Sequence, residues 1–471
     1  MSQINKPTID IKKEHTRRQF IKTSALGTGS LIAGVSLVAQ QAQAMQNPVR
    51  PAGKKPNFLF IVCDQLSLNA ISSHGCQDVK TPHIDHLVNR GVSFMESHST
   101  SPVCSPARSS FFTGLMPVET GVVSNDRPIN KDVPTMGNWF AQAGYESVYT
   151  GKWHLPYGYS NIIDGFKVLP AGVGQGDLVD TVVSRSCESY LKNRSQSNPF
   201  VLVASFMQPH DICYWAINPD ILVPKDLPFE DLKDKLPDLP PNNKAWPKAP
   251  KALSNARYDA FDDKQWQYYR YIYFRQIEML DADVGRVLAA LDASGQADDT
   301  IIIFTSDHGE GAGCHSLVSK WHPYDESMKV PLVFCCPGKI PQGRKDTAHL
   351  VSGLDIMKTM CDYAEIQPPK NPLALSLKPL IKGDDTPWRE FLSADTNFGG
   401  RIIRSQRYKY VKYPNDPAEQ LFDMKEDPLE TVNLYDNPKH ASVMEEHRQL
   451  AKQWDSQLNP VPPSPVDIPG A

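Results

Sequence analysis

Cys104, Pro106 and Arg108 form the clearest chemical pattern in the sequence, a C-x-P-x-R pentapeptide. A proline suits the first turn of a helix and Gly114 suits its end, so the sequence predicts a helix that opens at this pentapeptide. The positive end of that helix would favour an anionic group beside the thiol and the guanidinium. The pattern therefore indicates a site for an anion, with a buried structural cysteine as the alternative.

Two further polar residues follow continuous apolar runs, which are typical of buried parallel strands. Asp64 follows residues 57–63, and His210 comes shortly after residues 200–206. Ligand sites of α/β proteins lie at the carboxyl ends of such strands. Judged by itself, His210 could be an ordinary loop histidine, but its position at a strand end favours a functional role.

The elements that must position these residues alternate along the chain. Apolar runs at residues 57–63, 200–206 and 300–305 are separated by helical patterns at residues 134–143 and within 258–291. Such alternation predicts an α/β fold, a large mostly parallel mixed sheet sandwiched by helices.

The chain changes character in two places. Residues 219–250 are rich in proline and charge, which indicates an ordered surface loop or lid. Beyond about residue 386, short alternating segments and an amphipathic pattern over residues 439–458 predict a smaller α+β subdomain, with a short antiparallel sheet and a helix. We therefore expect a large α/β domain over residues 54–385 and a C-terminal subdomain over residues 386–471.

The first 44 residues have the order of an export signal. Arg17 and Arg18 stand in a basic region, a short apolar stretch interrupted by glycines follows, and residues 42–44 resemble a cleavage site. The paired arginines are similar to a Tat-type signal peptide, whose export needs the Tat machinery. A membrane anchor or a basic amphipathic helix is the alternative, but the apolar stretch is short and broken. We expect residues 1–44 to be removed and the protein to be periplasmic or secreted.

Composition narrows the class of protein. The 471 residues carry 49 basic and 53 acidic side chains, and 40% of them are hydrophobic, as in soluble globular enzymes. Without its basic first 44 residues the chain would be more acidic still, so we expect no nucleic acid as a partner. No other apolar run is long enough to span a bilayer. The nine cysteines are scattered without CxxC pairs, so no zinc ribbon or redox motif is visible.

The pentapeptide and several later segments resemble the type I, formylglycine-dependent sulfatases of the alkaline-phosphatase superfamily. Lys320, four residues before Tyr324, fits the family's K-x-x-x-Y pattern. The likeness extends over nearly the whole chain after the export signal, in segments that keep the family's order: residues 81–94, Gly151-Lys152-Trp153-His154-Leu155, Ser306-Asp307-His308-Gly309-Glu310, Leu421-Phe422-Asp423 and Glu426-Asp427-Pro428.

This resemblance implies a sulfuric ester hydrolase, similar to arylsulfatases, whose Cys104 is converted to formylglycine by a formylglycine-generating enzyme. The hydrated aldehyde would attack sulfur through one hydroxyl, with Arg108 orienting it, and the second hydroxyl would allow sulfate to be expelled. An unmodified cysteine has no second hydroxyl and could not complete this cycle.

The resemblance also assigns roles to four residues around the nucleophile. Lys152 and Lys320 would neutralise the sulfate oxygens as charge builds in the transition state. His154 would act as the base in sulfate expulsion, and His210 would protonate the leaving alcohol. Taken singly, the two lysines could instead be solvated surface residues.

A divalent metal ion is implied as well, with ligands from two loops and the modified cysteine: Asp64, Gln65, Cys104, Asp307 and His308. Gln65 stands where the family usually has a second aspartate, and His308 where it often has asparagine. This set carries less negative charge than a three-carboxylate calcium site. We expect Ca²⁺ first, with Mn²⁺ as the alternative because an imidazole is among the ligands.

The expected substrate is a small anionic sulfate ester, a sulfated saccharide in particular, because the export signal indicates scavenging outside the cytoplasm. The Asp-Gln and Asp-His pairs also resemble the phosphonate monoester and phosphodiester hydrolases and the choline sulfatases of the same superfamily. A phosphonate or phosphodiester substrate is therefore one alternative. A non-catalytic binder of sulfated glycans is another, and the complete set of site residues argues against it.

Overall fold

The computed structural model describes residues 55–466 apart from 226–229, 259, 368–369, 397–398 and 415. These residues belong to one compact unit. The expected export signal lies outside the described residues, and the expected boundary near residue 385 stays a prediction. Among the described helices, none is both long enough and apolar enough to cross a membrane.

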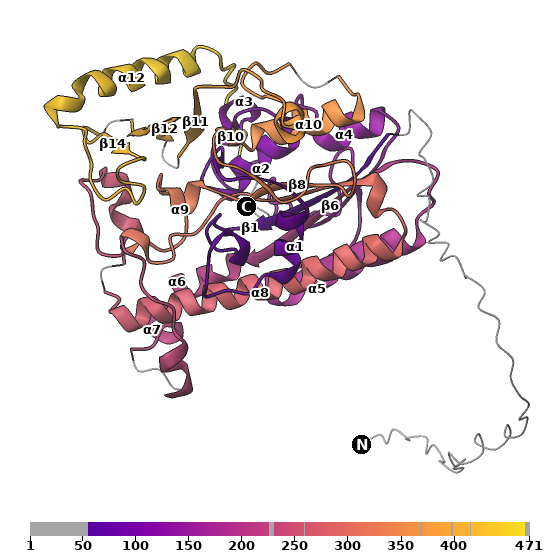
Figure 1. The fold of residues 1–471 in the computed structure, drawn as a ribbon, viewed down its shortest axis with the longest axis horizontal. Coiled ribbons are helices and arrows are strands. Elements are labelled where there is room, and N and C mark those ends of the chain that lie inside the picture. Colours follow the sequence, from indigo (N-terminus) through magenta and orange to yellow (C-terminus); the bar gives the residue numbers. More distant parts are fainter. Residues whose placement is uncertain are drawn as a thin grey trace, which may run out of the picture. The chain divides into compact units, whose positions relative to one another are not determined.

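A mixed sheet forms the centre of the fold (Figure 1). Its strands are β1 (Asn57–Asp64), β2 (Gly91–Phe94), β4 (Glu146–Gly151), β5 (Lys167–Val168), β6 (Phe200–Pro209), β7 (Thr300–Ser306), β8 (Leu332–Cys335) and β9 (Arg344–Asp346). They lie in the order β5-β4-β6-β1-β7-β8-β2-β9. Neighbours are parallel except that β8 runs antiparallel to both β7 and β2. The predicted fold class is confirmed.

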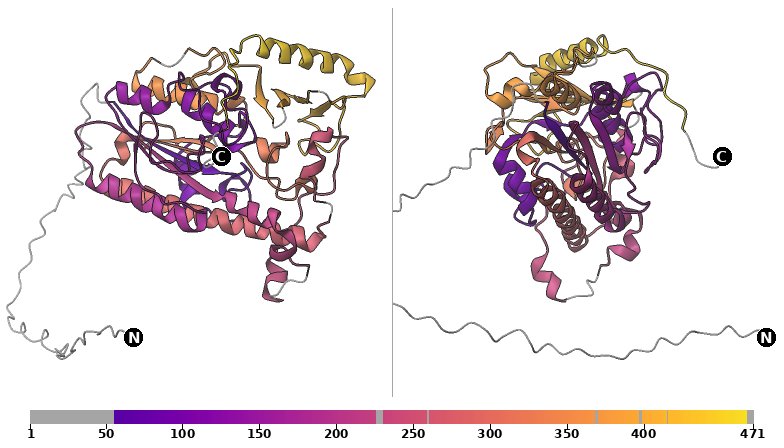
Figure 2. Two further views of the ribbon diagram at one scale, coloured as in Figure 1. Left: turned by 180° about the vertical axis from the view of Figure 1, so that it is seen from behind. Right: turned by 90° about the vertical axis from the view of Figure 1, so that its right-hand side faces the viewer.

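Helices cover both faces of this sheet because its central strands are apolar on both sides (Figure 2). Successive residues of β1 point into two different cores, so Phe58 and Phe60 pack on one face and Leu59 and Ile61 on the other. The first core includes α2 (Cys104–Thr113), α4 (Met136–Gln142), α10 (Leu354–Ala364) and α11 (Lys378–Lys382). The second includes α1 (Pro82–Arg90), α5 (Gly176–Asn193) and α8 (Asp263–Ala293).

The C-terminal part contains a small antiparallel sheet and a helix, as the sequence predicts. The strands are β11 (Phe391–Asp395), β12 (Arg401–Ser405), β13 (Tyr408–Lys412) and β14 (Gln420–Asp423), paired in that order, and the helix is α12 (Ala441–Asp455). Ala394 and Val411 of this sheet share a hydrophobic cluster with Tyr324 and Met328. The small sheet is therefore packed against the segment that follows Lys320.

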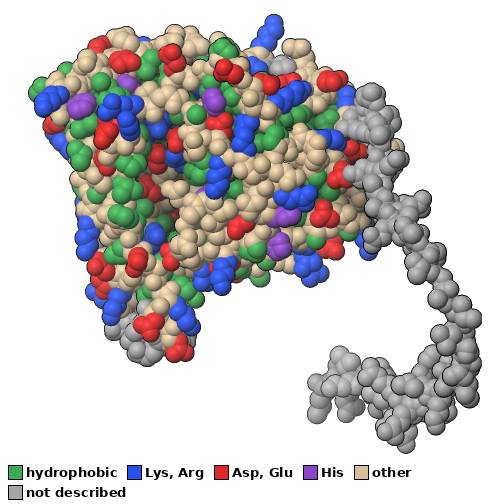
Figure 3. All heavy atoms as spheres, viewed as in Figure 1, with side chains coloured by type: hydrophobic (Ala, Val, Ile, Leu, Met, Phe, Trp, Pro, Cys, Tyr) green, Lys and Arg blue, Asp and Glu red, His purple; other side chains and the backbone are tan. Residues whose placement is uncertain are grey.

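The remaining α-helices and strands are short and lie in the connections. They are β3 (Ser97–His98), α3 (Pro117–Thr120), α6 (Cys213–Ile217), α7 (Pro219–Leu222), α9 (Asp325–Met328) and β10 (Val351–Ser352), where β3 pairs with β10. The proline-rich segment 219–250 holds α7 and a 3-10 turn over Glu230–Lys235, but its Asn242 and Asn243 are buried. Its later part thus belongs to the packed body. Over the face in Figure 3, basic and acidic side chains are interspersed.

Candidate active site

Four neighbouring strands of the large sheet end at one place. β1 ends at Asp64, and β7 is followed by Asp307 and His308. β4 is followed by Lys152, and β6 by His210. Because β4, β6, β1 and β7 are adjacent and parallel, their carboxyl ends meet at the same edge of the sheet. The strand order therefore gathers residues that are far apart in the sequence.

Helix α2 brings the pentapeptide to this edge. It begins at Cys104 and ends before Gly114, whose φ of 70° is the left-handed conformation that glycine adopts without strain. Cys104 Sγ lies 3.2 Å from His308 Nε2 and 3.8 Å from Asp64 Oδ1. The predicted helix and its contact with the strand ends are both present.

Asp64, Cys104, Asp307 and His308 form a cluster that suits a divalent cation. Their ligand atoms all lie within 4.8 Å of one another, and all four residues are buried. His308 Nδ1 is 2.9 Å from the carbonyl oxygen of Gly309, which can only accept, so the ring nitrogen facing the cluster is an unprotonated Nε2 in the neutral ring. Two carboxylates, an imidazole and a sulfur or oxygen from residue 104 are chemically fit to hold such an ion.

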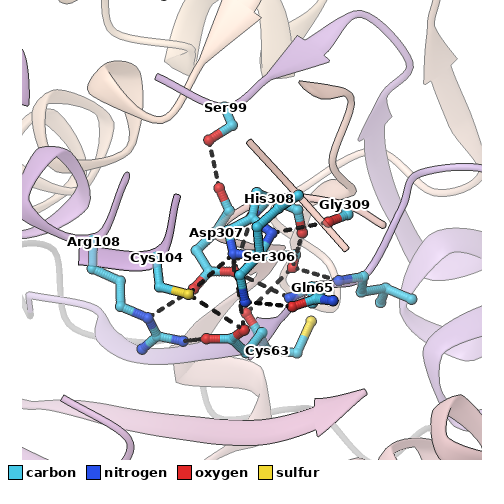
Figure 4. Close-up of polar contacts among 12 residues, drawn as sticks. Cys63, Gln65, Ser99, Cys104, Arg108, Ser306, Asp307, His308 and Gly309 are labelled. Carbon is cyan, nitrogen blue, oxygen red and sulfur yellow. Dashed lines mark hydrogen bonds and ion pairs between the residues drawn. The ribbon is translucent and has the colours of Figure 1, made fainter. Parts of the chain in front are cut away.

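Arg108 is fully buried and binds both carboxylates of the cluster (Figure 4). Its Nε donates to Asp307 Oδ2 at 2.8 Å and its Nη2 to Asp64 Oδ2 at 3.1 Å. Nη1 donates to the carbonyl oxygen of Lys152 and to Ser205 Oγ. Burial would lower the pKa of the guanidinium, but the two carboxylates raise it above its ordinary value. Arg108 thus aligns the acidic ligands as well as lying close to the nucleophile.

Lys152 and Lys320 are both buried, which excludes the alternative of solvated surface lysines. Their exposed fractions are 2% and 3%. Lys152 Nζ lies 2.5 Å from Asp64 Oδ2, and Lys320 Nζ donates to Gln65 Oε1 at 2.6 Å. Two desolvated ammonium groups beside a cysteine form a strong local site for an anion.

The charges around Cys104 change the acidity of its thiol. Burial and Asp64 would raise the pKa of Cys104, but the ammonium groups of Lys152 and Lys320 lower it, and it lies well below its ordinary value. The surroundings therefore stabilise negative charge at residue 104. All nine cysteines lie among the described residues, and none of them forms a disulfide there.

His154 and His210 have ring nitrogens without a partner among the described residues. His154 has a positive φ of 61°, its Nε2 lies 3.4 Å from Asp126 Oδ1, and its buried Nδ1 makes no hydrogen bond there. His210 Nδ1 is likewise buried and unpaired in that part of the chain. Burial, Lys320 and Lys152 lower the pKa of His210 well below its ordinary value, so its ring is neutral. Such nitrogens can exchange protons with a bound substrate.

Gln65 lies at the edge of the cluster, between a carboxylate and an ammonium. Its Nε2 donates to Glu310 Oε2 at 2.5 Å, and its Oε1 accepts from Lys320. Its backbone N–H donates to Asp307 Oδ1 at 3.1 Å. The described contacts thus join Gln65 to the site, and its place among the metal ligands stays a prediction.

Sequence reasoning assigned no role to four polar residues that contact the site: Ser205, Asp126, Glu310 and Cys213. Ser205 is hidden inside the apolar run of β6, and no local pattern marks Asp126, which belongs to a loop. Cys213 Sγ lies 3.3 Å from Gln65 Nε2 and 3.8 Å from Lys320 Nζ, three residues after His210. Glu310 stands in the Ser306–Glu310 segment, close to Asp307, and this closeness in the sequence is the signal that could have indicated its place at the site.

Comparisons with known proteins agree with this geometry. The profile of the sulfatase family matches residues 56–366, and that of the N-sulphoglucosamine sulphohydrolase C-terminal region matches residues 313–457. A Δ4,5-hexuronate-2-O-sulfatase of Bacteroides thetaiotaomicron is 31% identical over 460 residues, which cover 89% of this chain and 91% of the relative.

Solved structures give the same result. A protein described as a 2-O GAG sulfatase superposes with a TM-score of 0.74 at 29% identity, covering 89% of this chain and 99% of its own. A phosphonate monoester hydrolase of Agrobacterium radiobacter has a TM-score of 0.72 at 24% identity, covering 86% and 96%. The latter likeness shows a shared fold alone.

Proposed function

The chain belongs to the sulfatase family and is a sulfuric ester hydrolase. On this premise we propose that its substrate is a sulfated saccharide and that residue 104 is the nucleophile that removes the sulfate. The observation that carries the proposal is the position of Cys104, which contacts Asp64 and His308 and whose acidity is set by Lys152 and Lys320. A saccharide is supported by the relative that acts on a hexuronate 2-O-sulfate.

Sulfatases of this family use a formylglycine made from the pentapeptide cysteine, and we infer the same conversion of Cys104. Its hydrate supplies two geminal hydroxyls: the oxygen of one bonds to sulfur as the bond from sulfur to the alcohol oxygen breaks, and loss of the proton of the other restores the aldehyde as sulfate departs. The unpaired Nδ1 of His154 accepts that proton.

The other side chains act on the sulfate group and on the leaving alcohol. Lys152 and Lys320 stabilise the negative charge on the sulfate oxygens, and burial makes each interaction stronger than it would be in water. A sulfate ester held between these lysines offsets their charge, and so removes one of the causes that lower the pKa of His210. His210 can then be protonated and donate to the leaving oxygen.

A bound divalent cation supplies positive charge next to the nucleophile and the sulfate oxygens. Asp64, Asp307 and His308, with Gln65 and the oxygen of the modified residue 104, would hold it. We propose Ca²⁺ as the ion because carboxylate and amide oxygens dominate the set, with Mn²⁺ as the competitor that accepts the imidazole of His308. Equilibrium dialysis against both ions decides between them.

Hydrolysis of a phosphonate or phosphodiester is the second candidate. Gln65 and His308 favour it, because these residues distinguish the site from the commoner sulfatase pattern. A non-catalytic role is disfavoured, since the buried lysines and the unpaired histidine nitrogens form a reactive site.

Two measurements test the proposed chemistry. Mass spectrometry of the peptide with Cys104 should find a species about 18 Da lighter than the thiol form, because oxidation to the aldehyde replaces sulfur by oxygen and removes two hydrogens. The matured protein should release sulfate from sulfated saccharides faster than phosphate from a phosphodiester. Unmodified thiol in fully active protein would contradict the nucleophile, and faster phosphodiester hydrolysis would favour the second candidate.

We also propose that the protein is exported through the Tat pathway, on the strength of Arg17 and Arg18. Replacing both by lysine keeps the charge but removes the pair that this pathway reads. The precursor should then stay in the cytoplasm, as fractionation and immunoblotting would show. Normal export of the double variant would point to a signal of another type.

A further inference from the structure

We propose that Glu310 is a positioning residue that fixes the side-chain amide of Gln65 so that its oxygen faces Lys320. Glu310 is 1% exposed, and its carboxylate lies beside the site cluster, where its hydrogen bonds come from Gln65 and from groups outside the cluster. The inference rests on the proposed function only in treating Lys320 as a ligand of sulfate.

The two oxygens of Glu310 accept different sets of hydrogen bonds. Oε1 accepts from Ser319 N at 2.7 Å, from the hydroxyl of Tyr269 at 2.9 Å and from Ala312 N at 3.1 Å. Oε2 accepts from Gln65 Nε2 at 2.5 Å. Four donors around one buried carboxylate hold it in a single position.

This arrangement determines which way round the Gln65 amide lies. A carboxylate only accepts, so the Gln65 atom that faces it must be the NH₂ group, and the amide oxygen is turned toward the ammonium of Lys320. The flipped amide would place its oxygen against Glu310 and its NH₂ against Lys320. Both contacts would then be repulsive. Glu310 therefore determines which of the two possible orientations the Gln65 amide adopts.

Glu310 also holds the backbone that carries Lys320. Its bond to Ser319 N fixes the residue before the lysine, and Ser319 and Trp321 have φ values of 64° and 81°. Positive φ values at such residues persist where surrounding contacts enforce them. One carboxylate therefore positions Lys320 from two directions, through its main chain and through the acceptor on its ammonium.

The test exchanges donor and acceptor between residues 65 and 310. In Glu310→Gln, the oxygen of the new amide can accept from the three donors of Oε1. The NH₂ group of residue 310 then faces the NH₂ group of Gln65. The Gln65 amide could avoid this clash only by flipping, which would turn its own NH₂ group toward Lys320. In the double variant Gln65→Glu with Glu310→Gln, residue 310 donates and residue 65 accepts from both neighbours. The net charge of the double variant equals that of the parent.

The binding of inorganic sulfate is measured by calorimetry with calcium supplied, in a Cys104→Ala background that excludes turnover. Equilibrium dialysis gives the calcium affinity of the same samples. We expect Glu310→Gln to weaken sulfate binding about tenfold and the double variant to return it to within about threefold of the parent. The single variant Gln65→Glu should weaken sulfate binding, so rescue by the double variant cannot come from the added carboxylate.

Asp281→Asn is the matched control, because Asp281 is another buried carboxylate and accepts from the backbone N–H groups of His83 and Ile84 in α1. It should lower the thermal midpoint and leave the sulfate and calcium affinities unchanged. Sulfate binding unaffected by Glu310→Gln, or a double variant no better than that single one, would overturn the positioning role. If the parent itself bound no sulfate, the role of Lys320 in the proposed function would be contradicted, and with it the inference.

Discussion

Two of the buried groups of charged residues in the described part of the chain differ in what their charges face. The site cluster consists of Asp64, Cys104, Asp307 and His308. The junction cluster consists of Lys409, Asp325 and Glu430, beneath the small C-terminal sheet. Lys409 Nζ lies 2.6 Å from Asp325 and 2.5 Å from Glu430, and it donates to the carbonyl oxygen of Pro323 at 3.0 Å.

The junction cluster is closed and the site cluster is open. Every donor of Lys409 has an acceptor from the protein, so its ammonium has no capacity left for a ligand. In the site cluster, Arg108 and Lys152 bind the outer carboxylate oxygens, while the sulfur of Cys104 and Nε2 of His308 face each other and Asp64 Oδ1. A buried charged group by itself therefore does not distinguish a structural role from a functional one. Lone pairs of several residues that converge on one point indicate a binding site.

The largest effect is expected from Cys104→Ala. Because the side chain carries the nucleophile, turnover should fall at least about a thousandfold, whereas the loss of one small buried group should cost only about 1 kcal/mol of folding free energy. Sulfate release and thermal unfolding of the same samples check both parts. Turnover within tenfold of the parent would show that the open cluster is not the reaction centre.

The next effect concerns metal binding by His308. Replacing it with alanine removes the nitrogen ligand and leaves Asp64 and Asp307 facing each other, so metal content and activity should be lost together, by about a hundredfold. Elemental analysis after dialysis against calcium or manganese measures this. Gln65→Asp adds a carboxylate instead and should strengthen calcium binding, and unchanged metal in His308→Ala would remove that residue from the shell.

The sequence predicts the open cluster better than the closed one, for a physical reason. Asp64 and His210 follow apolar runs, and Cys104 opens a helix in a recognisable pentapeptide, so local patterns place them at strand and helix ends. The partners of Lys409 are fixed by the packing of β13 on α9, which no local pattern records. Asp126 escaped assignment for the same reason, since its contact with His154 joins elements that only the fold brings together. Glu310 lies close to Asp307 in the sequence, but its contact with Gln65 likewise depends on the fold.

The two clusters should respond in opposite ways to loss of a lysine. Lys409→Met leaves Glu430 buried without a cation and leaves Asp325 with Lys329 alone, so the free energy of unfolding should fall by about 3–5 kcal/mol while kcat/KM below the unfolding transition stays within about threefold. Lys320→Met should lower kcat/KM by about a hundredfold with a smaller loss of stability. Urea unfolding and steady-state kinetics on both proteins compare them. If Lys409→Met and Lys320→Met lost the same free energy of unfolding, the distinction between the closed junction cluster and the open site cluster would be contradicted.

A pH experiment examines the charges beside the junction cluster. Burial would raise the pKa of Glu96, but the hydrogen bond from His98 and the ion pair with Lys329 lower it from 4.5 to about 2. A lowered carboxyl pKa stabilises the fold above the ordinary value and loses that effect as pH falls from about 4.5 toward 2. Glu96→Gln should therefore be less stable by on the order of 2–3 kcal/mol at pH 7, and the difference should vanish near pH 2. A difference independent of pH would show that packing is responsible.

The smallest effect is expected at Asp126, on the rim of the open cluster. Its carboxylate lies 3.4 Å from Nε2 of His154 and is 62% exposed, so water and salt screen its influence. Asp126→Asn should lower kcat about threefold, because the ring of His154 is then less firmly oriented, and high salt should lower the parent's kcat toward that of the variant. Asp132→Asn, at an exposed position further along the same connection, is the control and should change nothing. A loss that high salt leaves unchanged would mean that Asp126 acts through a contact other than the charge beside His154.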